Sequence, residues 1–141
     1  MGTGFQYPDL GVDLLRLTLR CRDIDKHLSA RVGLTIDEVH CLGVIHSENP
    51  SCAKQLTELL HVDATRTSKI LRSLERRGLV SRTLSVADHR KEQVILTDEG
   101  RRIIERILSL YAQLGSRVFD AWPPEVIADL PRLLQELEHE V

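Results

Sequence analysis

Hydrophobic residues recur at helical spacing near both ends of the chain. In residues 8–30 they fall at steps of three, four and seven, which predicts a helix with one apolar face. Residues 97–120 and 125–138 show the same periodicity, although Pro131 lies inside the last segment and is expected to bend it. The apolar positions are Leu10, Leu14, Leu17, Ile24 and Leu28; Ile103, Ile104, Ile107, Leu108, Tyr111 and Leu114; and Val126, Ile127, Leu130, Leu133, Leu134 and Leu137. Amphipathic helices are therefore predicted on both sides of the middle of the chain.

The middle of the chain begins with a further predicted helix over residues 36–47. Thr35 and Glu38 have the spacing of a capping box, in which each side chain binds a backbone N–H at the start of the helix. Asn49-Pro50 ends the segment, because a proline disfavours helical geometry in the residue before it. The many apolar residues between these two signals predict a mostly buried helix.

Two short helices are predicted next. Ser51 is expected to cap a helix over residues 52–60, and Asp63 is expected to cap a second helix that ends at Gly78. Only the residues 61–63 separate the two segments. Two short helices joined by such a turn form a helix-turn-helix.

A β-hairpin is predicted after the helix-turn-helix. Residues 79–84 and 92–96 contain β-favouring side chains with polar ones between them, and residues 85–91 separate the two segments as an exposed tip. The predicted fold class is therefore mostly α with a small β-hairpin wing (α+β). In this fold a winged helix-turn-helix is inserted between the flanking helices.

Charge is distributed unevenly along the 141 residues. Residues 51–91 contain nine lysines and arginines against four acidic residues, a local net charge of +5, whereas the whole chain carries −2. Everything outside this stretch therefore sums to −7. Such a division is typical of a protein that meets a polyanion on one face.

The second short helix separates its residues into two faces. Thr67, Ile70, Leu71 and Leu74 form one stripe, and the opposite stripe is polar and basic, with few acidic residues four positions away. A helix that follows a tight turn and presents such a face favours insertion into the major groove of DNA. The predicted DNA contacts of this helix are Thr65, Arg66, Thr67, Ser68, Lys69, Arg72 and Arg76.

Two motifs resemble those of the MarR family of winged-helix transcriptional regulators. The stretch LTELLHVDATRTSKILRSLERRGLVSR is similar to the family's helix-turn-helix and first wing strand, and DHRKEQVILTDEG is similar to its wing signature. The resemblance implies that Arg90 enters the minor groove or grips phosphate while Asp88 orients it, with Lys91 as a further wing contact. His61 departs from the pattern, because this turn often has a glycine; histidine tolerates a positive φ at modest cost.

The same resemblance implies an obligate homodimer, a repressor on a pseudo-palindromic operator, whose DNA binding is weakened by a small ligand or an oxidant. The apolar stripes independently predict a partner surface, because they are more extensive than one winged helix can cover. We therefore expect one domain, in which residues 36–96 bind DNA while residues 8–32 and 97–141 dimerise. A two-fold dimer would read half-sites about one helical turn apart.

The cysteines and histidines offer other candidate chemistry. Cys21, Cys41 and Cys52 are an odd number without CxxC spacing, which argues against a disulfide framework and a zinc ribbon. Free cysteine usually behaves as a small core residue, but some MarR proteins sense oxidants through a cysteine in the first helix, and Cys21 is the nearest candidate. None of the six histidines has HxxxH spacing, so neither a metal nor a cofactor is expected.

Two other classes of function, an enzyme and a protein adaptor, make different demands on the sequence. The chain has no glycine-rich phosphate loop, no GxSxG and no HExxH, so the sequence does not predict an enzyme. The alternative that remains is a helical-dimer adaptor whose winged helix binds a protein partner. No apolar run approaches the roughly 18 residues of a membrane span. The first ten residues lack the features of a secretory signal, so a cytoplasmic protein is expected.

Overall fold

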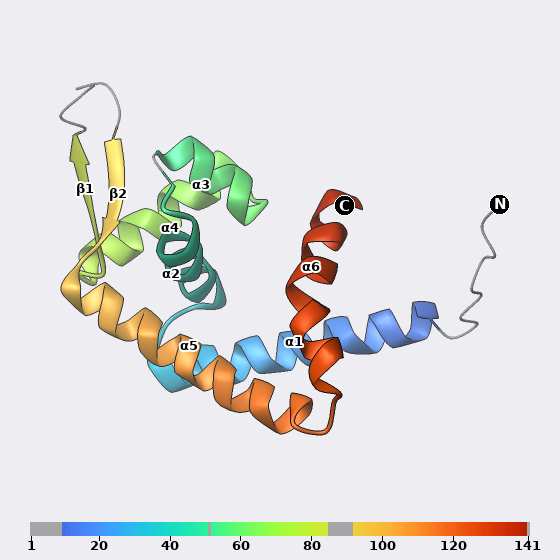
Figure 1. The fold of residues 1–141 in the computed structure, drawn as a ribbon. Coiled ribbons are helices and arrows are strands. Elements are labelled where there is room, and N and C mark those ends of the chain that lie inside the picture. Colours follow the sequence, from blue (N-terminus) through green and yellow to red (C-terminus); the bar gives the residue numbers. More distant parts are fainter. Residues whose placement is uncertain (1–9, 51, 85–91, 141) are drawn as a thin grey trace. The chain divides into compact units, whose positions relative to one another are not determined.

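The computed structural model describes residues 10–50, 52–84 and 92–140, and this part of the chain contains six helices and two strands (Figure 1). The elements are α1 (Leu10–Val32), α2 (Ile36–Glu48), α3 (Ala53–Leu60), α4 (Ala64–Arg76), β1 (Val80–Leu84), β2 (Glu92–Leu96), α5 (Asp98–Phe119) and α6 (Pro124–Glu140). They divide between two compact units, Met1–Ile107 and Leu108–Val141, so α5 begins in the first unit and ends in the second. The mostly helical fold with a small hairpin confirms the predicted fold class.

Helix α2 begins with the capping box that the sequence predicts. The Thr35 hydroxyl accepts a hydrogen bond from the Glu38 N–H (3.1 Å), and the Glu38 carboxylate accepts one from the Thr35 N–H (3.3 Å). Gly33, with φ of 69°, ends the preceding helix α1. The His40 ring pairs with the Asp25 carboxylate (3.1 Å) and joins α2 to α1.

Helices α3 and α4 form the predicted helix-turn-helix. His61 ends α3 in the left-handed conformation, with φ of 54°, so this turn has the positive φ that histidine adopts at modest cost. Asp63 caps α4 as predicted, because its carboxylate accepts a hydrogen bond from the Arg66 N–H (2.7 Å). The prediction for the start of α3 was wrong by one residue. The N-cap is Cys52, which makes no side-chain cap bond, rather than Ser51, which lies outside the described residues.

The core of the first unit is made of aliphatic side chains from all five of its helices. Burial of each such side chain stabilises the fold by about 1.5–3 kcal/mol. The side chains that are at most 1% exposed include Leu28 of α1, Leu42 of α2, Leu56 of α3, Leu71 and Leu74 of α4, and Ile104 and Ile107 of α5. The winged helix therefore shares one core with α1 and the first half of α5.

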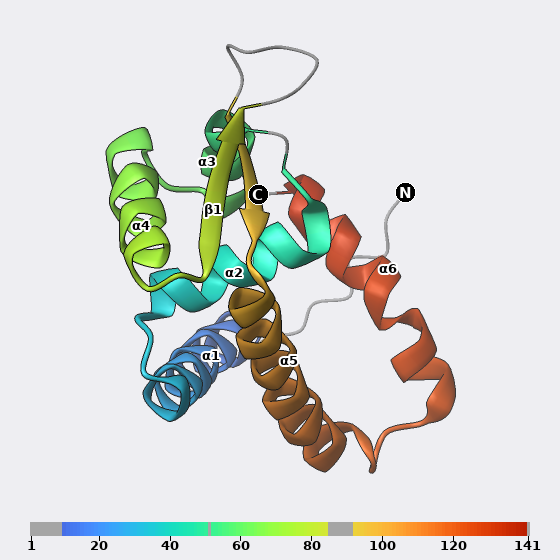
Figure 2. The same ribbon diagram turned by 90° about the vertical axis from the view of Figure 1, so that its left-hand side faces the viewer.

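Strands β1 and β2 form an antiparallel hairpin beside α4 (Figure 2). The register runs from Val80 opposite Leu96 to Leu84 opposite Glu92. Val80 and Val94 face the core and are 3% and 4% exposed. On β2, buried Val94 lies between exposed Gln93 and Ile95, which is the period-two pattern of a sheet with one covered face.

The base of the hairpin is tied to the end of α4 and the start of α5. The Thr97 hydroxyl donates a hydrogen bond to the Gly78 carbonyl (2.6 Å) and accepts one from the Gly100 N–H (3.0 Å). The Thr97 N–H donates to the Leu79 carbonyl (3.0 Å). A Cβ atom on Gly100 would lie 2.0 Å from that carbonyl oxygen, so only glycine fits at this position of the first turn of α5.

The second unit contains the end of α5 and helix α6. Helix α6 continues through Pro131, and beyond it Leu133, Leu134 and Leu137 are exposed. Arg132 pairs with Asp129 (2.6 Å) on another side of the same helix. Among the described helices, none combines the length and apolar character that crossing a membrane requires.

Candidate nucleic-acid interface

Helix α4 presents a polar, basic face to solvent, as its sequence pattern predicts. Ile70, Leu71 and Leu74 are buried on its inner face. The side chains that are exposed on the opposite face are Thr65, Ser68, Lys69, Arg72 and Arg76. The helix begins at a capped N-terminus, so its first turn also directs backbone N–H groups and the positive end of the helix dipole outward.

The cations of this face are weakly opposed by acidic residues. Lys69, Arg72 and Arg76 surround a shallow depression together with the carboxylate of Glu75. The Glu75 carboxylate pairs with Arg82 of β1 (3.0 Å). Its negative charge is therefore partly neutralised by the arginine of the hairpin. The depression is therefore a positively charged surface that suits phosphate oxygens and the acceptor atoms of base edges.

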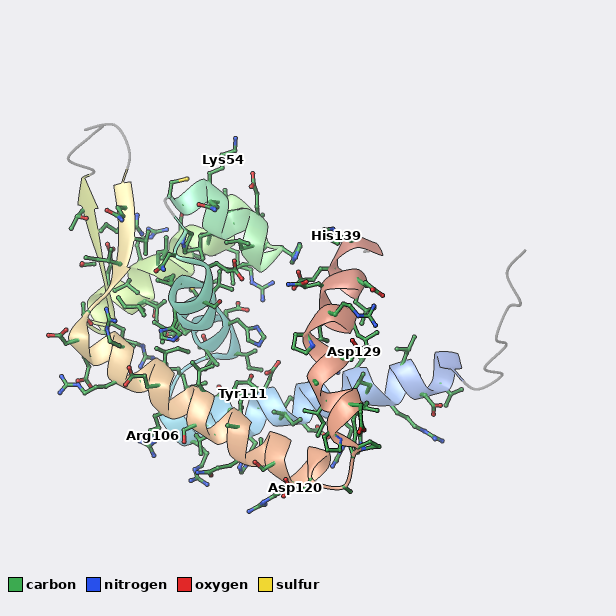
Figure 3. The ribbon with its side chains drawn as sticks, in the orientation of Figure 1. Lys54, Arg106, Tyr111, Asp120, Asp129 and His139 are labelled. Atoms are coloured by element: carbon green, nitrogen blue, oxygen red, sulfur yellow. The ribbon has the colours of Figure 1, made fainter. Side chains whose placement is uncertain are left out.

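Lys54 is a further cation of the helix-turn-helix. It lies in the first turn of α3 and points away from the fold, whereas Arg106 extends from α5 on the side away from α3 (Figure 3). Both side chains are exposed. Lys54 was not among the predicted contacts, although it belongs to the basic stretch identified in the sequence.

Arg66 differs from the other cations of α4. The sequence places it on the exposed stripe, and its side chain is indeed 55% exposed. Its guanidinium, however, makes two hydrogen bonds to the carboxylate of Asp37 in α2, from Nε to Oδ2 (2.8 Å) and from Nη2 to Oδ1 (2.8 Å). Arg66 therefore lies on the flank of α4 that faces α2.

Asp37 was missed by the sequence analysis, and so was its neighbour Glu38 as a partner of α4. Glu38 is 3% exposed and pairs with Arg77 at the end of α4 (3.0 Å), in addition to its capping role. The pairs join residues that are 29 and 39 positions apart, which no local pattern can indicate. The first turn of α2 thus contacts α4 at both of its ends.

Thr67 was predicted to contact DNA, but the structure does not place it on the exposed face of α4. It is 1% exposed. Its hydroxyl lies 2.9 Å from that of Thr57 in α3 and 3.1 Å from the Asp63 carbonyl. A side chain enclosed in this way joins the two helices of the motif and is not on the surface that would meet DNA. The buried stripe of the sequence pattern, rather than the contact set, describes Thr67 correctly.

The predicted wing contacts Asp88, Arg90 and Lys91 lie outside the described residues. Their roles stay predictions. The described strands on either side of them end at Leu84 and begin at Glu92.

The three thiols lie in different surroundings. Cys21 on α1 is exposed, Cys52 is partly exposed and Cys41 on α2 is buried. Burial, helped by the nearby carboxylates Glu38 and Asp37, raises the pKa of Cys41 to about 12. This thiol therefore stays neutral and poorly nucleophilic at physiological pH. In the described part of the chain, no group of three or more His, Cys, Asp or Glu side chains is arranged to hold a metal ion.

Comparison with known proteins gives one consistent result. A model of the MarR family matches residues 32–91. A MarR family protein from Bacillus stearothermophilus superposes with a TM-score of 0.80 at 20% identity, over 94% of this chain and 93% of that one. CouR from Rhodococcus jostii RHA1, bound to p-coumaroyl-CoA, gives 0.76 at 23% identity, over 92% and 91%. An S. aureus MepR–DNA complex gives 0.64 at 17% identity, over 89% and 94%.

The family match covers the helix-turn-helix and the first four residues of the wing motif, and the structural matches extend the same fold over nearly the whole chain. Residues 32–91 are similar to the MarR family, and nearly the whole chain has the fold of a solved MarR family protein. The resemblance that the two sequence motifs indicate is confirmed.

Proposed function

We propose that this protein is a transcriptional regulator that binds double-stranded DNA in a sequence-specific manner, as a homodimeric repressor on a pseudo-palindromic operator. The observation that carries the proposal is the exposed face of α4, the second helix of the helix-turn-helix, which begins at a capped N-terminus and presents Lys69, Arg72 and Arg76. The S. aureus MepR–DNA complex supports it, because a protein of the same fold is there in contact with DNA. A DNA-binding regulator acts where the chromosome is, which in a bacterium or archaeon is the cytoplasm.

Dimerisation is proposed from the apolar faces of the outer helices. On α1, Val12, Leu14, Leu15, Leu17 and Leu19 are 48–59% exposed. On α6, Leu133, Leu134 and Leu137 are 40–56% exposed. Stripes of this length on two helices are more than a soluble monomer normally exposes to water. We therefore assign residues 8–32 and 97–141 to dimerisation and residues 36–96 to DNA binding.

We further propose that a small-molecule effector or an oxidant weakens DNA binding by this protein. CouR is described with p-coumaroyl-CoA and S. aureus MepR with ethidium bromide, so the fold accommodates small molecules in those proteins. If an oxidant is the signal here, Cys21 is the candidate sensor because its thiol is exposed. Cys41 is unsuited, since its raised pKa keeps the reactive thiolate scarce.

The proposal is tested on duplexes that the purified protein selects from a randomised library. Binding to a selected duplex and to a random duplex of equal length is measured by fluorescence anisotropy over a range of salt concentrations. Arg66→Ala and Lys69→Ala should each weaken binding to the selected duplex by about 1–3 kcal/mol and relax preference at one or two base pairs. Arg76→Ala, further from the helix N-terminus, should have a smaller effect.

Arg106→Ala is the control, because it removes one exposed positive charge on the side of α5 away from α3. It should leave the selected base preference unchanged. Equal losses on selected and random duplexes for all the α4 variants would show that α4 does not read bases. A wild type that selects no duplex and shows no fall in affinity with salt would instead favour the protein adaptor.

A further inference from the structure

The pair between Arg66 and Asp37 leaves part of the guanidinium available. Arginine has five N–H donors in a planar fork. The carboxylate of Asp37 takes the donors on the Nε and Nη2 side, at 2.8 Å each. The three remaining donors belong to Nη1 and to the other side of Nη2, which together form the end of the side chain. That end can donate two parallel hydrogen bonds, the geometry in which arginine recognises O6 and N7 of guanine.

Both partners of this pair are fixed by their own elements. The backbone of Arg66 is fixed by the Asp63 cap at 2.7 Å. Asp37 lies in the first turn of α2, where a carboxylate is favoured by the helix dipole, and the adjacent Glu38 is bound by both Thr35 and Arg77. An unrestrained arginine loses rotamer freedom when it binds, whereas a restrained one has already lost much of it.

We infer that Asp37 is a positioning residue, which holds the guanidinium of Arg66 so that its free end contacts a base edge, and thereby helps to set the sequence preference. The inference rests on the proposed function and deepens it, since it assigns a role in DNA recognition to a residue of α2. Electrostatics alone predicts the opposite sign. Asp37 is one-third exposed beside a surface that meets DNA, so a merely repulsive carboxylate would weaken binding to every duplex.

The test is the Asp37→Asn variant, measured on a duplex selected by the wild type and on a random duplex. Loss of the charged clamp should weaken binding to the selected duplex by about tenfold, within the range that one bidentate base contact contributes. Binding to the random duplex should stay equal or become slightly tighter, because a negative charge has been removed. Preference should flatten at the same base pair that Arg66→Ala affects.

A double-mutant cycle separates positioning from a general effect on the fold. In an Arg66→Ala background the arginine side chain that Asp37 holds is absent. Asp37→Asn should therefore cause no further loss of affinity for the selected duplex. Asp23→Asn on α1 removes an equal charge that pairs with Arg20 at 3.9 Å, and it should leave the preference unchanged. Arg66→Lys, which keeps the charge but cannot form the fork, should lose binding to the selected duplex as Asp37→Asn does.

Three results would overturn the inference while leaving the proposed function intact. The first is that Asp37→Asn binds both duplexes more tightly by the same factor. The second is that Asp37→Asn still weakens binding to the selected duplex in the Arg66→Ala background, and the third is that Asp37→Asn leaves the base preference unchanged. Selection of no duplex by the wild type would overturn the proposed function itself. The two failures are therefore distinguishable in one set of measurements.

Discussion

Replacing Gly100 with alanine tests the joint between the hairpin and α5. The Cβ of the new residue would lie 2.0 Å from the Leu79 carbonyl oxygen and 2.9 Å from the carbonyl carbon. The oxygen already accepts the hydrogen bond from the Thr97 N–H (3.0 Å), so it cannot turn aside without weakening that bond. The backbone of Leu79 or the first turn of α5 must therefore move.

The expected loss follows from three contributions of known size. Forced overpacking of a methyl group against rigid surroundings costs about 1–3 kcal/mol, and the large overlap here points to the upper end. Loss of the backbone hydrogen bond adds about 1 kcal/mol. The better helix propensity of alanine returns about 1 kcal/mol, because Gly100 lies within α5. Gly100→Ala should thus lower the free energy of unfolding by about 3 kcal/mol.

Gly43 supplies a matched control in the same unit. A Cβ at this position of α2 would have Ile104 Cδ1 as its nearest neighbour, at 3.9 Å, which is ordinary van der Waals contact. Gly43→Ala should therefore stabilise the protein by up to about 1 kcal/mol. Both variants are compared by urea unfolding, followed by far-UV circular dichroism at one fixed protein concentration. If Gly100→Ala proves as stable as Gly43→Ala, the close approach to Leu79 is not a constraint on the fold.

Other predictions concern the thiols, the turn and the wing. At pH 8 a thiol-specific reagent should modify Cys21 quickly and Cys41 only after unfolding, because burial raises the pKa of Cys41; equal rates of reaction would contradict its burial. His61→Gly should raise the free energy of unfolding by up to about 1 kcal/mol, since glycine adopts the positive φ without strain, and an unchanged urea midpoint would argue against strain at this turn. Asp88→Ala should weaken DNA binding in anisotropy titrations by releasing Arg90, whereas tighter binding would leave the wing as a merely basic loop.

Local signals in the sequence identify most elements of this fold. The structure confirms the capping box at Thr35, the cap at Asp63 and the apolar stripe of α4. These features were predictable because each depends only on neighbours within a few residues. The start of α3 was misplaced because Ser51 is a better capping residue by type than Cys52. Type alone does not decide which residue has the extended backbone of an N-cap.

Contacts between distant parts of the chain could not be predicted from local sequence patterns. Nothing near Asp37 indicates a partner 29 residues away, and the helical pattern of α4 alone cannot show that Arg66 lies on the flank toward α2. Gly100 is the last residue of the motif DHRKEQVILTDEG, but the reason for glycine there is the backbone of Leu79, which lies too close to leave room for a Cβ atom. Exposure of the α4 face was predictable, whereas the orientation of each cation depended on tertiary structure.

The hydrogen bonds of Thr97 also determine how the hairpin can change in length. They close a segment whose ends, Gly78 and Thr97, are 19 positions apart, and they do so at its base rather than at its far end. The entropy of closing a flexible segment grows only with the logarithm of its length. Adding about six residues between β1 and β2 should therefore raise the closure free energy by only about 0.2 kcal/mol. The reach of this hairpin can consequently be altered by insertion or deletion with little effect on stability, while Gly78, Thr97 and Gly100 at its base cannot be exchanged so freely.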